Sequence, residues 1–114
     1  MHHASMIDKE LIAATSRAFV LSILMEGDSY GYSIIQRVSE LTDKKFEWTD
    51  SMLYPVLHRL EKQGSTRAYW KPSPTGRKRK YYSLTDAGRE ELADKQRQWQ
   101  IAARAFNSLW HRKN

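Results

Sequence analysis

Three segments with helical periodicity, two short aromatic-rich segments around a turn, and a last long helical segment predict a mainly α-helical protein with a small β-hairpin. Three helices with a hairpin after the third describe a winged helix-turn-helix. Its 114 residues fit one domain. We expect residues 8–85 to form the winged-helix domain and residues 86–114 a C-terminal helix. Residues 1–7 are expected to be disordered or cloning-derived.

The first two helices are predicted from apolar residues that recur every three or four positions. Over residues 8–25 this stripe, free of Pro and Gly, consists of Leu11, Ile12, Ala14, Ala18, Phe19, Leu21, Ile23 and Leu24. Residues 26–29 contain Gly27 and predict a turn. A second helix is predicted over residues 31–41, and the polar residues 42–45 end it.

A third helix is predicted to begin after Thr49 as N-cap and to end near Gln63, before Gly64. Its apolar stripe has the spacing i, i+3, i+4, i+7 and consists of Leu53, Val56, Leu57 and Leu60. Pro55 lies inside this span. Proline is tolerated in a first helical turn, so either the regular helix begins nearer Ser51 or the segment is kinked.

The hairpin and the final helix complete the pattern. Residues 67–70 and 80–84 are short, aromatic-rich strands, and residues 72–76 form the turn between them. Thr85 is the expected N-cap of the last helix, and Asp86 lies in its first turn, where a negative charge is favourable.

The excess charge of the chain is concentrated in the hairpin. Residues 67–80 contain six basic residues and no acid, which leaves the rest of the chain with 13 basic and 13 acidic residues. Such a local excess predicts a polyanionic partner, although a solvated surface loop has the same composition. The absence of cysteine favours a reducing cytoplasm, and the absence of a long apolar run or signal peptide argues against a membrane partner.

The exposed side of the third helix is a candidate surface for reading bases. Its apolar stripe turns inward, so the outer side carries Ser51, Tyr54, His58 and Lys62. Hydroxyl, imidazole and ammonium groups can contact base edges and phosphates in a major groove. Every amphipathic helix has a polar face, however, and an ordinary solvated face is the alternative.

The tip of the hairpin is the second candidate DNA contact. Gly76 permits a tight turn, and it is followed by four cations, Arg77, Lys78, Arg79 and Lys80. Because neighbouring strand residues point to opposite sides, two or three of the four can face a phosphate backbone together. A localisation signal or a solvated loop would explain the same run of residues.

Three segments resemble the PadR family of bacterial transcriptional regulators, in particular its short-tailed branch with a single C-terminal helix. They are Tyr30-Gly31-Tyr32, residues 48–64 with their Leu-Tyr-Pro motif, and residues 76–88 with Gly-Arg-Lys-Arg-Lys-Tyr-Tyr. The resemblance implies a homodimer that represses by binding double-stranded DNA at a palindromic operator and that a small molecule releases. It also implies that Tyr32 and Gln36, the outer face of the third helix and the hairpin cations contact DNA. Ser65 and Thr66 replace apolar residues usual in the family, so loose packing is expected there.

The last helix predicts an oligomer. Its apolar stripe has heptad-like spacing, and together with Phe19 of the first helix we expect it to form a homodimer interface. The expected interface residues are Phe19, Leu92, Trp99, Ala102, Phe106, Leu109 and Trp110. Each large side chain buried against a partner would contribute roughly 1.5–3 kcal/mol. The alternative is that the helix folds back onto its own core.

Trp99 is a candidate effector site. In some PadR relatives, a tryptophan at the matching place lines a ligand pocket at the dimer interface, and the resemblance therefore implies a slot for a planar aromatic small molecule. Its expected lining is Ala18, Ser22, Leu92, Trp99 and Ala103. The alternative is an interface aromatic residue that binds nothing.

The sequence offers no support for an enzyme. It contains no clustered metal ligands, phosphate-binding glycine loop or nucleophile elbow, so neither a catalytic residue nor a metal or other cofactor is expected. A winged helix can also serve as a protein-interaction module that binds no specific DNA, and this is the second hypothesis. Such a module would not need a concentrated cationic hairpin.

Overall fold

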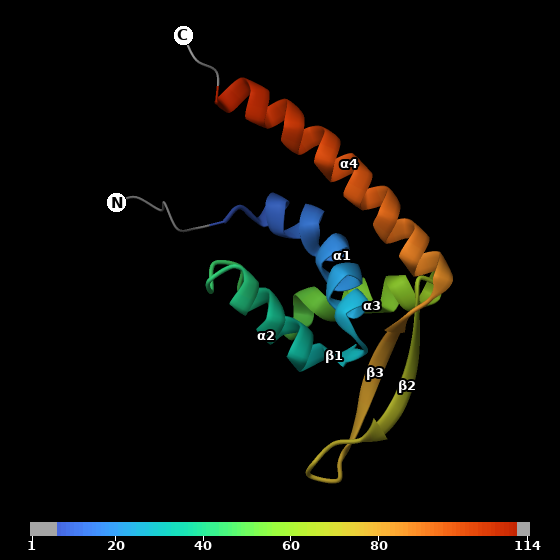
Figure 1. Ribbon diagram of the computed structural model, residues 1–114. Helices are drawn as coiled ribbons and strands as arrows, with labels where there is room; N and C mark the ends of the chain where they lie inside the picture. Colours follow the sequence, from blue (N-terminus) through green and yellow to red (C-terminus); the bar gives the residue numbers. More distant parts are fainter. Residues whose placement is uncertain (1–6, 112–114) are drawn as a thin grey trace.

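The computed structural model describes residues 7–111 and has the predicted winged-helix order, as Figure 1 shows. Its elements are α1 (Lys9–Glu26), β1 (Ser29–Tyr30), α2 (Gly31–Leu41), α3 (Asp50–Lys62), β2 (Thr66–Pro72), β3 (Lys78–Leu84) and α4 (Asp86–Trp110). None of the helices between residues 7 and 111 has an apolar stretch long enough to span a bilayer. The disordered or cloning-derived segment predicted over residues 1–7 lies outside the described residues except at Ile7, which packs against the core.

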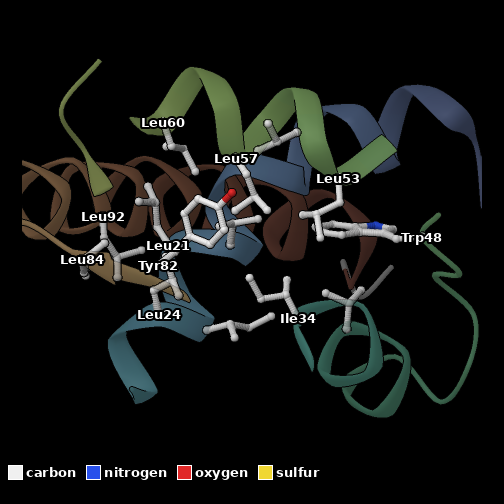
Figure 2. Close-up of a cluster of buried hydrophobic side chains, with 14 of the residues drawn as sticks. Leu21, Leu24, Ile34, Trp48, Leu53, Leu57, Leu60, Tyr82, Leu84 and Leu92 are labelled. Atoms are coloured by element: carbon white, nitrogen blue, oxygen red, sulfur yellow. The ribbon is translucent and has the colours of Figure 1, made fainter. Parts of the chain in front are cut away.

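The core forms where the inner faces of the helices meet the base of the sheet (Figure 2). The predicted stripe of α3 is buried in full, and Leu57 and Leu60 are completely inaccessible. In α1 the stripe is only partly buried, since Leu11 is exposed while Leu21 and Leu24 are buried. The completely buried side chains are close-packed, so α3 is held rigidly with its opposite face in solvent.

The sheet has one more strand than the sequence predicted. β1 pairs with β3, which gives the antiparallel order β1-β3-β2. Residues 26–29 were expected to form only a turn, but Ser29 belongs to β1. The hairpin strands also extend closer to the tip than predicted, because the pairing continues to Pro72 opposite Lys78. The wing is therefore longer and its base broader than a simple hairpin.

The predicted bounds of the helices agree with the structure to within a few residues, but one cap differs. Thr49 is the N-cap residue of α3, yet its side chain forms no capping hydrogen bond within the described chain; its Oγ1 lies 3.0 Å from Ser51 Oγ instead. Thr85 does cap α4, accepting a hydrogen bond from the Gly88 amide at 3.1 Å. α3 runs through Pro55 as a single helix.

The first turns of α4 belong to the core of the winged-helix domain. Leu92, expected at the dimer interface and in the effector slot, is only 2% exposed and lies in the protomer's own core. Gly88 is buried where α4 crosses the chain before β2: a Cβ on it would lie 2.1 Å from the Ser65 carbonyl oxygen. The expectation for Leu92 was wrong because heptad spacing alone cannot show where the core ends along a helix.

A polar network joins α1, α4 and the start of the wing. Glu91 accepts hydrogen bonds from Arg17 Nη2 at 3.0 Å and from Ser65 Oγ at 2.7 Å, and Arg17 Nη2 also donates to Gln63 at 2.6 Å. Ser65 and Thr66 are both buried. The structure therefore differs from the loose packing expected at these two residues: the Ser65 hydroxyl has a polar partner inside, whereas the buried Thr66 hydroxyl has no hydrogen-bond partner among the described residues.

Beyond Leu92, α4 leaves the domain and extends past α1, as Figure 1 shows. Four large side chains of the predicted stripe are 45–69% exposed in this distal part, and they are Trp99, Phe106, Leu109 and Trp110. The Phe106 and Trp110 rings stack in parallel with centroids 4.7 Å apart. The helix does not fold back onto its own core: Trp99 still lies beside α1, whereas Leu109 and Trp110 near its end are largely exposed.

Candidate nucleic-acid interface

The outer face of α3 presents the predicted polar side chains to solvent. Ser51, Tyr54, His58 and Lys62 are all exposed, while the opposite stripe is buried. Tyr54 is 52% exposed despite its large ring. An exposed helix face held by a rigid core on its other side can enter a major groove without rearrangement.

The first turn of α2 adjoins the start of α3. A Cβ on Gly31 would lie 3.4 Å from the Tyr54 hydroxyl oxygen, so glycine allows the two helices to approach closely. Tyr32 is 64% exposed, and its hydroxyl accepts a hydrogen bond from Gln36 Nε2 at 3.1 Å. The sequence-predicted residues of α2 thus lie together beside those of α3.

The tip of the wing is a closed, hydrogen-bonded turn. The Ser73 amide donates to the Arg77 carbonyl at 2.7 Å, and the Gly76 amide donates to the Ser73 carbonyl at 2.9 Å. Gly76 has φ of 90°, a left-handed conformation that favours glycine. The turn leaves Arg77 and Lys78 exposed at the end of the wing.

A hollow of about 440 Å³ joins these three surfaces. Tyr32 of α2, Tyr54 of α3 and the wing residues Lys78, Arg79 and Lys80 lie around it. Trp70 also lines it and is 62% exposed, although no sequence pattern marked it as a site residue. Trp70 follows Tyr69 in β2, and the register in which β2 pairs with β3 could not be read from the sequence.

Two of the four wing cations have partners within the protein. The Arg79 guanidinium lies 4.3 Å from the centroid of the Tyr30 ring. Lys80 Nζ lies 3.3 Å from Glu61 Oε1 on α3. Partial burial lowers the pKa of Lys80. The hydrogen bond to Glu61 and the nearby Tyr82 both raise it, and their combined effect is larger, so the pKa of Lys80 is above its ordinary value. The four cations are thus not equivalent.

A second hollow, of about 270 Å³, lies between α1 and α4 beside Trp99. Three of the residues expected to line the effector slot, Ala18, Ser22 and Trp99, line this hollow. Ala103 does not line it, and Leu92 is in the core. Several wall residues were not predicted, and they come mainly from α1: Thr15, Phe19, Ile23, Glu26 and Leu41. Phe19, predicted only as an interface residue, therefore belongs to this hollow.

Glu26 connects this second hollow to α2. Arg37 Nη2 on α2 lies 2.7 Å from Glu26 Oε2, and Arg37 Nε lies 3.0 Å from Glu26 Oε1. The hydrogen bonds from Arg37 lower the pKa of Glu26. The carboxylate is charged at neutral pH, and it occupies a wall that is otherwise largely apolar.

Comparison with known proteins places this geometry among bacterial regulators. The family model described as the transcriptional regulator PadR-like family matches residues 20–94. Protein X of Lysinibacillus sphaericus is 34% identical over 94 residues, covering 82% of this chain and 86% of that protein. The negative transcriptional regulator PadR of Bacillus subtilis is 31% identical over 75 residues, which are 66% of this chain and 41% of that protein.

Solved structures agree over almost the whole chain. A transcriptional regulator from Clostridium thermocellum has 31% identity and a TM-score of 0.80, covering 90% of this chain and 96% of that one. A PadR family transcription regulator from Clostridium difficile has 30% identity and a TM-score of 0.75, with 84% and 98% covered. A PadR-like transcriptional regulator from Bacillus cereus has 25% identity and a TM-score of 0.82, with 92% and 100% covered.

Proposed function

We propose that this chain, which belongs to the PadR-like family of transcriptional regulators and is a DNA-binding regulator, is a homodimeric repressor of a palindromic operator. A small-molecule effector releases it from that operator. The observation that carries the proposal is the exposed polar face of α3 next to the exposed cations at the tip of the wing. Repression follows from occupying promoter DNA. The relative from Bacillus subtilis that is named a negative regulator supports this direction of control.

The contacts with DNA divide between bases and backbone. In this proposal the exposed α3 residues Ser51, Tyr54, His58 and Lys62 meet base edges, and Tyr32 and Gln36 on α2 contact DNA beside them. Wing cations neutralise phosphates beside the groove and release counterions, which makes the affinity strongly dependent on salt. Sequence preference would then come from α3, and much of the affinity from the wing.

The distal half of α4 is the proposed dimer contact. Four large apolar side chains on it are exposed, and such a stripe is rarely left in water on a monomer. Ala102 is half-buried against α1, and Phe106, Leu109 and Trp110 continue the stripe outward. A second copy of the same helix can cover this stripe through a two-fold axis, since such an interface uses one patch on both protomers.

The hollow beside Trp99 is the proposed effector site. Its wall is apolar apart from Glu26 and two hydroxyls, and the half-exposed Trp99 ring can stack on a planar aromatic ligand. A ligand that contacts Glu26 competes with Arg37 and so acts on α2, which carries Tyr32 and Gln36. Release follows only if the ligand binds better to the arrangement that fits DNA worse.

An electrophoretic mobility shift titration tests the proposal. The probe is the duplex upstream of the chain's own gene, with random-sequence competitor, at 50 and 200 mM salt. We expect one specific complex with the mass of a dimer, weakened on the order of 10³-fold or more between the two salts if six or more phosphates are contacted. The absence of a sequence-specific complex at both salt concentrations would instead indicate a protein-interaction module.

A further inference from the structure

Side chains alternate along the wing, so its cations lie on two different faces of the sheet. In the register of β2 and β3, Lys71 lies opposite Arg79. Lys80 reaches Glu61 on α3, so the face that carries Lys80 and Lys78 is turned toward α3. The side chain of Arg79, one position between them, is therefore on the opposite face of the strand, where it reaches Tyr30, although the residue also borders the hollow beside Tyr54.

On that opposite face Arg79 has aromatic neighbours. Its guanidinium lies over the Tyr30 ring at 4.3 Å, and the Tyr30 ring meets Tyr81 edge-on with centroids 5.2 Å apart. Arg79 is half-buried, whereas Arg77 and Lys78 are exposed. A cation over an aromatic face is attracted by the ring quadrupole, so this contact holds the Arg79 side chain in place.

Tyr30 is the point at which the wing meets α2. It is the N-cap residue of α2 and also half of β1, where it lies opposite Tyr81 of β3. The stacked Arg79 therefore ties the wing to the helix that carries Tyr32. On the other face, the pair of Lys80 with Glu61 ties the same strand to α3.

We propose that the wing cations divide by role. Arg77 and Lys78 contact phosphate, whereas Arg79 and Lys80 are positioning residues that fix the wing to α2 and α3. Tyr30 is then a positioning residue for DNA binding, acting through Arg79. The inference rests on the proposed contact between the wing and DNA.

The test is the salt dependence of binding, measured by fluorescence anisotropy on the duplex upstream of the chain's own gene. Arg77→Gln is expected to reduce the slope of log K against log salt by about 1 for each phosphate that is no longer neutralised. Arg79→Gln and Tyr30→Leu are expected to weaken binding about three- to tenfold, with a much smaller change of slope. The double variant should be no weaker than the weaker single variant, because both substitutions remove the same interaction.

Tyr30→Phe is the matched control, since it keeps the ring and should bind like the parent. Thermal unfolding checks the fold of each variant. If Tyr30→Leu does not fold, Arg79→Gln still tests the proposal, because it removes the same contact from the other side. The assignment is overturned if Arg79→Gln lowers the slope as much as Arg77→Gln does, or if a folded Tyr30→Leu binds like the parent. If Arg77→Gln and Lys78→Gln change neither affinity nor slope, the wing does not contact DNA, and the phosphate contacts that the proposed function assigns to the wing are wrong.

Discussion

At the scale of single residues, Glu91 joins three parts of the domain through its carboxylate. Arg17 and Lys95 form ion pairs with it, and Ser65 donates a hydrogen bond. Its side chain is 22% exposed, so water screens the ion pair with Arg17 only partly. The hydrogen bond from Arg17 is the main cause that lowers the pKa of Glu91, with Ser65 adding to it against the effect of burial.

Glu91→Gln is expected to lower the free energy of unfolding by about 1 kcal/mol at pH 7. Because the folded-state pKa lies below the unfolded value, the contribution is complete above that unfolded value and is lost as the pH falls through the folded pKa. The difference between parent and variant should therefore shrink on acidification. Urea unfolding at pH 7 and pH 3, at one protein concentration, measures it, with the exposed neighbour Glu90→Gln as control. A difference that stays constant with pH would contradict the role of the charge.

Trp99 is the residue on which the effector site depends. The planar aromatic cation 9-aminoacridine should quench its fluorescence, because the half-exposed Trp99 ring can stack on a flat ligand in this hollow. Trp99→Ala should weaken binding of the cation at least tenfold, and Trp70→Ala, outside this hollow, should leave the affinity unchanged. Equal affinity in Trp99→Ala and the parent would remove the hollow as a ligand site.

At the scale of elements, the sequence predicted those whose pattern repeats over several turns. The buried stripe of α3 and the cap at Thr85 followed from spacing and residue type alone. β1 did not, because its two residues are too few to show an alternation, and it exists only through pairing with β3. Such pairing is a tertiary contact that no local pattern encodes.

In the candidate site, too, local features could be predicted from the sequence, whereas contacts between elements could not. Exposure of the α3 face could be predicted from helical periodicity, and exposure of Arg77 from the turn residues around Gly76. The partners of Arg79 and Lys80 could not, because Tyr30 and Glu61 come from other elements. The wall of the hollow beside Trp99 was missed for that reason too: most of it belongs to α1, far away in the sequence.

The distal part of α4 makes a prediction of its own. Phe106→Asp should weaken the dimer by at least a hundredfold, because two large side chains per dimer lose their burial, worth roughly 1.5–3 kcal/mol each, and two charges enter the interface. Ser108→Asp is the matched control, since residue 108 lies on the opposite side of the helix from residue 106. Sedimentation velocity over a concentration series measures both, and equal dissociation constants for the two variants would place the interface elsewhere.

At the scale of the whole molecule, the wing and the proposed dimer contact at the end of α4 lie at opposite ends, with α3 between them (Figure 1). The protomer extends 60 × 37 × 20 Å, with the wing projecting from one side and the end of α4 from the other (Figure 1). Two protomers joined through α4 would therefore hold two copies of α3 at a fixed distance. That distance, together with the base contacts of α3, would select the operator.

Operator spacing is thus the sharpest property of the assembly. If the two α3 helices enter successive major grooves about 34 Å apart, inserting 5 base pairs at the dyad turns one half-site to the opposite face of the duplex. Binding should then fall by about a hundredfold or more, toward the nonspecific level, because one protomer no longer reaches its bases. Ten inserted base pairs restore the face but roughly double the separation, so a rigid dimer should still bind poorly. Base changes at the dyad that keep the spacing serve as the control in the same anisotropy titration. Unchanged affinity for the 5-base-pair insertion would mean that the protomers read DNA independently of each other.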